Sequence, residues 1–94
     1  MEEIYGAVFR MLEDGSNPEG WFAEERITMS DALRAYTYGS AYAMHAEDRI
    51  GTLACGKQAD ICVLDRNLFE CEPTDVLEAT SLLTMIAGKV VFEA

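Results

Sequence analysis

The spacing of apolar residues changes once along this chain, near residue 50. Before that point they recur every third or fourth residue, which is the period of a helix packed by one face. After it they form short runs between turn-forming glycines, which is typical of strands. This change predicts an α+β fold, with two N-terminal helices followed by a short strand and a C-terminal β-hairpin in one small sheet. It also predicts a helical segment over residues 1–48 and a β-sheet segment over residues 49–94.

The helical half contains two predicted helices separated by a loop. The first spans residues 2–13, and a loop over residues 14–20, rich in glycine, asparagine and proline, ends it. Its apolar stripe consists of Ile4, Val8, Met11 and Leu12. The second helix begins at Thr28 and continues to about Met44. The Thr28 hydroxyl can cap this helix, with Asp31 in the acidic position of a capping box.

The strand half contains three short predicted elements. Residues 59–65 are apolar between acidic ends, and their length and β-branched content predict a buried strand. Residues 74–79 predict one short helical turn. Residues 81–86 and 90–92 predict a β-hairpin, because Gly88 between them can adopt the positive φ that a tight turn requires.

The chain is strongly acidic, with 7 basic and 17 acidic residues and a formal net charge of −10. The electric field of this negative charge repels phosphate backbones and anionic lipid headgroups. We therefore predict neither a nucleic-acid partner nor a membrane partner. No apolar run approaches the length of a membrane-spanning helix, and the N-terminal acids Glu2 and Glu3 are unlike a secretory signal. Three cysteines without a C-x-x-C pair suit a reducing compartment, and we predict a cytoplasmic location.

The inventory of metal-ligating and nucleophilic side chains is small. The single histidine, His45, stands at the end of the second predicted helix, where a capping or surface role is expected. The spacings of Cys55, Cys62 and Cys71 match no zinc or iron–sulfur pattern. These cysteines are predicted to be buried or half-buried, with Cys62 filling part of a core. We therefore predict no catalytic, cofactor-binding or metal-binding residue in this chain.

The segment from Gly51 to Lys57 has the glycine spacing of a phosphate-binding loop but lacks its other features. Gln58 stands where that loop requires a serine or threonine for magnesium, and a strand follows where a helix should begin. The glycines Gly51 and Gly56 instead indicate turns that lead into the strand. Asp60 is expected to accept hydrogen bonds from nearby backbone N–H groups.

Five aromatic residues are concentrated in the helical half: Trp21, Phe22, Tyr36, Tyr38 and Tyr42. Aromatic residues at helical spacing usually belong to a core or an interface and seldom to a ligand site. If these side chains are exposed, they indicate a surface that a partner covers.

Several segments, in this order along the chain, resemble the metal-dependent amidohydrolases. They are ITMSDALRAYT (27–37) with AYA (41–43), IGTL (50–53), GKQAD (56–60) with VLD (63–65), and AGKVVF (87–92). The first is similar to the last barrel helix of that family, the next two to its return from the barrel to a small β-domain, and the last to its terminal hairpin. Residues 1–12 resemble the preceding helix. The most similar subgroup is the YtcJ-like amidohydrolase family 3.

The resemblance implies a function for the whole enzyme and a different role for these residues. In the family the metal-binding histidines, the carboxylated lysine or its substitute, and the catalytic aspartate lie upstream on barrel strands, so no catalytic residue maps onto this sequence. The resemblance then implies that the chain is the inactive C-terminal portion of a hydrolase. The whole enzyme is expected to cleave amide-type C–N bonds with a divalent metal, and zinc is the metal expected. The alternative is a free-standing oligomerisation or binding module derived from that family.

The positions that do match the family have structural roles. Thr28 matches as a cap, Gly51 and Gly56 as turns, Asp60 as a strand-entry residue and Gly88 as the hairpin turn. The implied partners are the N-terminal part of such an enzyme or a second copy of the chain. Self-association through strand pairing or segment exchange is expected, because open strand edges and an unburied helix face favour it.

Overall fold

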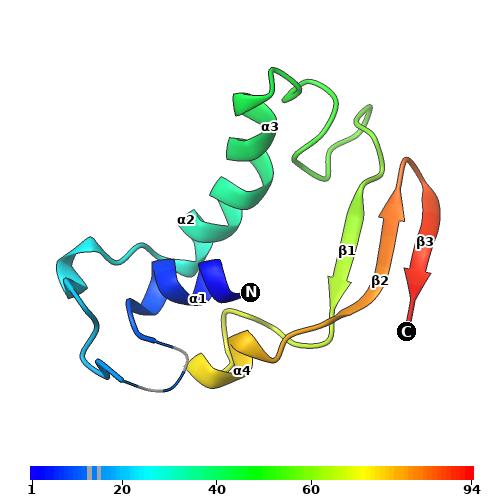
Figure 1. The fold of residues 1–94 in the computed structure, drawn as a ribbon. Coiled ribbons are helices and arrows are strands. Elements are labelled where there is room, and N and C mark those ends of the chain that lie inside the picture. The colour runs from blue at the N-terminus through cyan, green and yellow to red at the C-terminus, as the bar shows by residue number, and fades with distance from the viewer. Residues whose placement is uncertain (13, 15) are drawn as a thin grey trace. The chain divides into compact units, whose positions relative to one another are not determined.

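The chain is an α+β protein, as the sequence predicts (Figure 1). The computed structural model describes residues 1–12, 14 and 16–94. Glu13, the predicted end of the first helix, and Gly15, in the predicted loop, lie outside the described residues. The helical elements are α1 (Glu2–Phe9), a 3₁₀ turn (Ala23–Glu25), α2 (Met29–Arg34), a π-helical segment (Ala35–Gly39), α3 (Ser40–Ala43) and α4 (Pro73–Leu77). The strands are β1 (Ile61–Leu64), β2 (Ser81–Ile86) and β3 (Lys89–Glu93). Within the described ranges no helix is long and apolar enough to cross a membrane.

The chain forms two compact units, each assembled from two stretches of sequence. The first unit contains residues 1–33 and 66–79, and the second unit contains residues 34–65 and 80–94. Each unit has buried residues of its own. The sequence predicts a different division, into a helical segment over residues 1–48 and a β-sheet segment over residues 49–94. That division stays a prediction.

The core of the first unit lies between α1 and the residues around α4. Ile4 and Tyr5 of α1, Val76 of α4 and Leu68, which precedes α4, are all buried, and Val76 is 0% exposed. The helix α4 starts with Pro73 in its first turn, a position where the fixed φ of proline suits a helix and the missing N–H costs no hydrogen bond. The predicted helical turn over residues 74–79 is thus confirmed, beginning one residue earlier.

The helix α1 ends earlier than its apolar stripe predicts. It stops at Phe9, because Arg10 adopts a left-handed conformation with φ of 56° while its N–H donates to the Gly6 carbonyl. Arg10 also bonds twice to Trp21: its carbonyl accepts from the Trp21 N–H (2.6 Å) and its Nε donates to the Trp21 carbonyl (2.9 Å). These bonds turn the chain out of the helix, so the apolar Met11 and Leu12 lie beyond it.

The predicted start of the second helix is confirmed. The Thr28 hydroxyl accepts a hydrogen bond from the Asp31 N–H (3.0 Å), which satisfies one of the donors that a helix start leaves free. Helical residues then continue from Met29 to Ala43 through the π-helical segment. Within that stretch the Ser40 hydroxyl donates to the Ala35 carbonyl (3.0 Å), five residues back, as the wider π turn permits.

In the second unit a glycine allows the loop after α3 to approach the helical residues closely. Gly51 has φ of 100°, and a Cβ placed there would lie 2.8 Å from the Ala41 Cβ and 3.2 Å from the Tyr38 Cα. Ala41 is buried at this contact. The predicted turn at Gly51 therefore needs glycine for two reasons, its conformation and its close packing.

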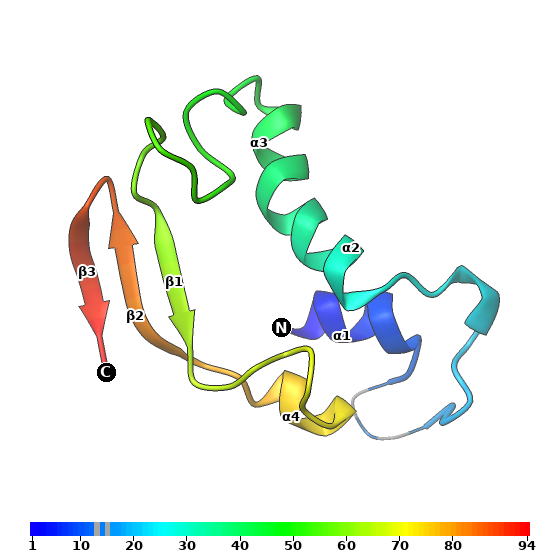
Figure 2. The ribbon, with the colours of Figure 1, turned by 180° about the vertical axis from the view of Figure 1, so that it is seen from behind.

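The sheet of the second unit is antiparallel, with strand order β1-β2-β3 (Figures 1 and 2). The predicted hairpin is confirmed: β2 and β3 are joined by Ala87 and Gly88, which have φ of 51° and 80°. Positive φ at both central residues is characteristic of the type I′ turn, whose twist matches the twist of the flanking strands. An irregularity interrupts each strand pair, between Val63 and Leu64 in one and between Thr84 and Met85 in the other.

The hairpin turn is held by the segment that enters β1. The Asp60 carboxylate accepts a hydrogen bond from the Ala87 N–H (2.8 Å), and the Ala59 carbonyl accepts one from the Gly88 N–H (2.9 Å). The expectation that Asp60 serves nearby backbone groups is wrong, because its backbone donor lies 27 residues away. The Ala87 N–H, followed by the side-chain amide of Gln58, lowers the pKa of Asp60 because both bonds favour the ionised carboxylate.

The strand β1 is not buried as its apolar sequence predicts. Val63 is 44% exposed, Cys62 is exposed, and all five residues of β3 are exposed. A unit this small has few residues left to cover its sheet once the strands and one helix are formed. The apolar run therefore correctly predicts a strand, but it incorrectly predicts that the strand is buried.

Substitution of Val76 tests the core of the first unit. Val76→Ala removes two buried methyl groups and should lower the free energy of unfolding by about 2 kcal/mol. Chemical denaturation followed by the fluorescence of Trp21, which belongs to the same unit, measures this. The matched control is Val91→Ala at a half-exposed position, which should change stability by less than about 0.5 kcal/mol. Equal effects of the two substitutions would contradict the assigned core.

Substitution of Asp60 tests the hairpin anchor. Because folding lowers the pKa of Asp60, its stabilisation is present above the unfolded pKa of 3.8 and is lost as the pH falls through the folded value. Asp60→Ala should lower the thermal midpoint at neutral pH. Asp60→Asn keeps an acceptor for the Ala87 N–H, so it should cost less and should reduce the loss of stability below about pH 4. Circular dichroism melts across this range provide the comparison, and identical pH profiles for wild type and Asp60→Asn would refute the anchor.

Candidate functional site

The second unit contains a hollow of about 780 Å³ between helical residues and the sheet, here called the sheet–helix hollow. Its helical lining is Tyr36, Thr37, Ser40, Ala41 and Met44. Its sheet lining is Ile61, Cys62, Thr84, Met85 and Ile86. Residues 50–53 and Asp60 complete the wall. The volume lies in the range of ligand-binding clefts, and the lining is mainly apolar.

Several polar groups in and beside the sheet–helix hollow form local hydrogen bonds. The Cys62 thiol donates to the Ser81 hydroxyl (3.5 Å), and the Ser81 and Thr84 hydroxyls lie 3.0 Å apart. A hydroxyl is not a base that would convert Cys62 to a reactive thiolate. The Asp60 carboxylate is bound to Ala87 and Gln58. The mainly apolar lining of the hollow suits an apolar group.

The metal-ligating side chains are dispersed over the fold. Among residues 1–12, 14 and 16–94, no three side chains of His, Cys, Asp or Glu are grouped so as to hold a metal ion. His45 is exposed two residues beyond the last residue of α3, with φ of 56° and its backbone N–H bonded to the Tyr42 carbonyl. Cys55 and Cys62 are exposed, so the expectation that they are buried is wrong, whereas Cys71 is half-buried as expected.

The glycine–lysine loop before β1, residues 56–58, forms hydrogen bonds to the segment that follows α3. Gly56 has φ of 88°, which confirms the predicted turn. The Lys57 ammonium donates to the Glu47 carbonyl, and the Gln58 N–H donates to the Arg49 carbonyl (2.8 Å). Lys57 therefore holds the segment that follows α3. The Glu47 carboxylate oxygen Oε2 is buried without a hydrogen-bond partner among the described residues.

The aromatic residues of the helical half lie largely at the surface. Trp21 is 63% exposed and Tyr42 is 61% exposed, and Phe22 and Tyr36 are also exposed. In the first unit Arg10 lies 5.5 Å from the Trp21 ring centre. In the second unit Arg34 lies 5.0 Å from the ring centre of Tyr38, which stacks on Tyr42 at 6.2 Å. Their exposure favours the interface interpretation over the core interpretation, because tyrosine, tryptophan and arginine are enriched at protein interfaces.

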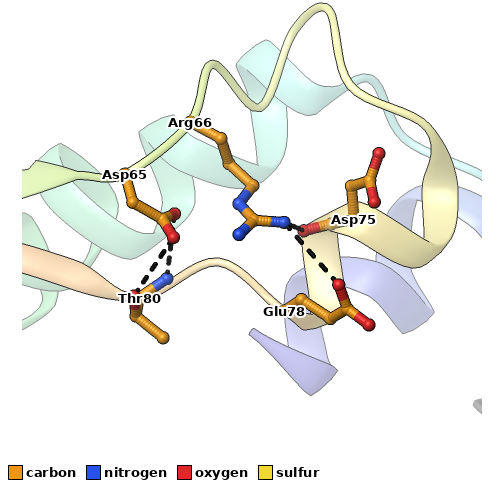
Figure 3. A network of polar contacts seen from close by, with 5 residues as sticks. All are labelled: Asp65, Arg66, Asp75, Glu78 and Thr80. Carbon is orange, nitrogen blue, oxygen red and sulfur yellow. Dashed lines mark hydrogen bonds and ion pairs between the residues drawn. The ribbon is translucent and has the colours of Figure 1, made fainter.

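Polar bonds secure the chain at the ends of both units (Figure 3). In the second unit the Asp65 carboxylate accepts hydrogen bonds from the Thr80 N–H and hydroxyl, each at 3.2 Å, and the Asp65 N–H donates to the Thr80 carbonyl (3.0 Å). In the first unit Arg66 donates to the Asp75 carbonyl (3.2 Å) and approaches the Glu78 carboxylate at 3.9 Å. The Arg66–Glu78 pair is partly exposed and contributes little to stability.

Comparison with known proteins identifies the family. The model described as "Amidohydrolase family" matches residues 1–92. The chain is 33% identical over 92 residues to an N-substituted formamide deformylase of Arthrobacter pascens, covering 98% of this chain and 16% of the relative. It is 30% identical over 90 residues to the putative amidohydrolase YtcJ of Bacillus subtilis, covering 96% of this chain and 17% of the relative.

The fold is also similar to a solved structure. It matches an amidohydrolase from Thermotoga maritima with a TM-score of 0.59 and 28% sequence identity, covering 76% of this chain and 17% of the other. The chain thus spans about a sixth of the length of the proteins that it resembles. Since the family match includes nearly every residue, this chain belongs to the amidohydrolase family.

Proposed function

We propose that this chain is the C-terminal, non-catalytic portion of a metal-dependent amidohydrolase, which cleaves amide-type C–N bonds when whole. The observation that carries this proposal is the match of nearly the entire chain to about a sixth of its relatives, together with a single histidine in 94 residues. A metal in such an enzyme supplies an activated water that attacks the amide carbon. The described residues do not fit that metal, because no three potential ligands are grouped among them. No catalytic step is therefore assigned to them.

The proposed role of these residues is to support the rest of the enzyme. The segment 56–60 holds the hairpin turn, and Gly51 fits the loop closely against α3. The exposed sheet and the exposed aromatic side chains supply apolar surface for contact. We propose that the N-terminal part of an amidohydrolase, or a second copy of the chain, covers this surface. The acidic charge supports neither nucleic acid nor membrane as a partner, and the free cysteines support a cytoplasmic location.

The exposed apolar surface also favours a second candidate function, that of a free-standing oligomerisation or binding module. Fifteen large apolar side chains of the described residues are exposed, including Trp21, Leu53 and Phe69 at more than 60%. Surface of this kind is typical of chains that bind another protein. The two candidates differ in whether the chain can serve inside an amidohydrolase, and that difference can be measured.

Metal binding and turnover by the purified chain test the non-catalytic assignment. After incubation with Zn²⁺ and exhaustive dialysis, elemental analysis should find far less than one zinc per chain. Hydrolysis of N-substituted formamides, the substrate class suggested by the relative from Arthrobacter pascens, should not exceed that of buffer. His45→Ala is the matched control and should behave as wild type. One tightly held zinc, or turnover that His45→Ala abolishes, would overturn the assignment.

A chimera tests the supporting role. In the chimera this chain would replace the matching segment of the N-substituted formamide deformylase of Arthrobacter pascens, a match that includes 98% of the chain. If the chain supports an amidohydrolase, the chimera should be soluble, unfold cooperatively and retain the metal content of the parent. The same chimera with Asp60→Ala should melt at a lower temperature, because the hairpin turn loses its anchor. An insoluble chimera, alongside a soluble and cooperatively folded 94-residue chain, would favour the free-standing module instead.

A further inference from the structure

A smaller pocket lies in the first unit, beside the end of α1. It has a volume of about 280 Å³, and all of its lining residues come from one stretch of sequence, residues 6–21. The pocket is therefore formed by local folding and not by the distance between separate segments. We call it the Arg10 pocket, and its lining residues are Gly6, Arg10, Met11, Leu12, Asn17 and Trp21.

The Arg10 side chain is fixed at the wall of this pocket. Its Nε donates to the Trp21 carbonyl (2.9 Å), and its guanidinium carbon lies 5.5 Å from the centre of the Trp21 ring. A guanidinium carries five N–H groups in a planar fork, of which this bond uses one. The other four form no hydrogen bond within the part of the chain that the structure describes. Arg10 therefore offers a positive charge and unused donors in a fixed position beside the pocket.

The lining of the Arg10 pocket favours one class of ligand. A guanidinium fork matches the two oxygens of a carboxylate, with which it forms paired, charge-assisted hydrogen bonds. The rest of the lining is mainly apolar, which suits a short hydrocarbon chain. A doubly charged phosphate is less favourable, because acidic residues far outnumber basic ones in the first unit and repel a dianion more strongly than a monoanion.

We propose that the Arg10 pocket binds a small carboxylate that carries a short hydrocarbon chain. The carboxylate oxygens accept hydrogen bonds from the unused N–H groups of Arg10, and the side-chain amide of Asn17 supplies a further donor. The hydrocarbon chain contacts Met11, Leu12 and the Trp21 ring. The volume lies near the lower limit of ligand-binding clefts, so the ligand is a small molecule.

Fluorescence titration tests this binding, because Trp21 is the single tryptophan of the chain. Sodium hexanoate should change the emission of Trp21 and saturate with a dissociation constant of about 1 mM, a value within reach of a ligand of this size. Hexanamide has the same shape without the charge, so it should bind at least about tenfold more weakly. Inorganic phosphate lacks the hydrocarbon chain and should also bind more weakly. Equal responses to hexanoate and hexanamide, or tighter binding of phosphate, would overturn the proposal.

Substitution of Arg10 tests which residue holds the carboxylate. Arg10→Gln removes the charge and the fork, so it should raise the dissociation constant for hexanoate at least about tenfold. The matched control is Arg34→Gln in the second unit. The Arg34 guanidinium also lies over an aromatic ring, 5.0 Å from the centre of Tyr38, but it does not line the pocket. This variant loses the same charge and should bind hexanoate as wild type does. If the two variants bind alike, the proposal is wrong.

Charged variants of Leu12 keep the experiment decisive if Arg10→Gln disturbs the fold. Leu12 lines the pocket but is 57% exposed, so a charged side chain can replace it with little effect on stability. Leu12→Glu should repel the carboxylate and weaken hexanoate binding, whereas Leu12→Lys should strengthen it. High salt should reduce the difference by screening both charges. Equal affinities of the folded Leu12→Glu and Leu12→Lys proteins would refute carboxylate binding in this pocket.

Nuclear magnetic resonance distinguishes the Arg10 pocket from the sheet–helix hollow. Hexanoate should shift the amide signals of residues 10–12 and the Nε signal of Arg10 more than the amide signals of Ile61 and Met85, which line the hollow. Shifts centred on the hollow would contradict the proposal, because they would assign the binding to its apolar lining. These measurements need neither metal nor turnover, so their outcome is separate from the test of the proposed function.

Discussion

The hydrogen bond from the Ala87 N–H to the Asp60 carboxylate is the contact on which the sheet of the second unit depends. It fixes the turn of the hairpin to the start of β1, while the Gly88 N–H bonds to the neighbouring Ala59 carbonyl. Strand pairs with irregularities on both sides of β2 could otherwise slip, and a slip by one residue would move every side chain to the opposite face. A charge-assisted bond to a backbone donor is short and directional, so it specifies one register.

The elements that sequence predicts best are those determined by local chemistry. The Thr28 cap and the hairpin at Gly88 depend on a few adjacent residues, and both are confirmed. The end of α1 is determined by Trp21, far along the chain, whose two bonds to Arg10 stop the helix before its apolar stripe ends. The partner of Asp60 is equally distant, which explains why local turn chemistry does not identify it.

Burial is the property that sequence predicts least well here. A run such as Ile61 to Leu64 encodes a preference for an apolar environment, but the residues that provide this environment lie elsewhere. In the second unit Val63 and Cys62 remain exposed, and in both units aromatic side chains do as well. The candidate site is likewise poorly predicted from the sequence. The sequence yields an inventory of ligands and nucleophiles, whereas the sheet–helix hollow arises from the distance between helical residues and strands that no local pattern specifies.

The residues that carry the resemblance include Gly51, Lys57 and Asp60, and each has a defined structural role. Gly51 packs closely on Ala41, Lys57 donates to the Glu47 carbonyl, and Asp60 anchors the hairpin. Such roles depend on backbone geometry, which tolerates change at surrounding positions. A segment can therefore retain recognisable similarity through its turns and anchors. Motifs of glycine, lysine and aspartate resemble active-site signatures in composition, but here the atoms to which they bond identify them as parts of the scaffold.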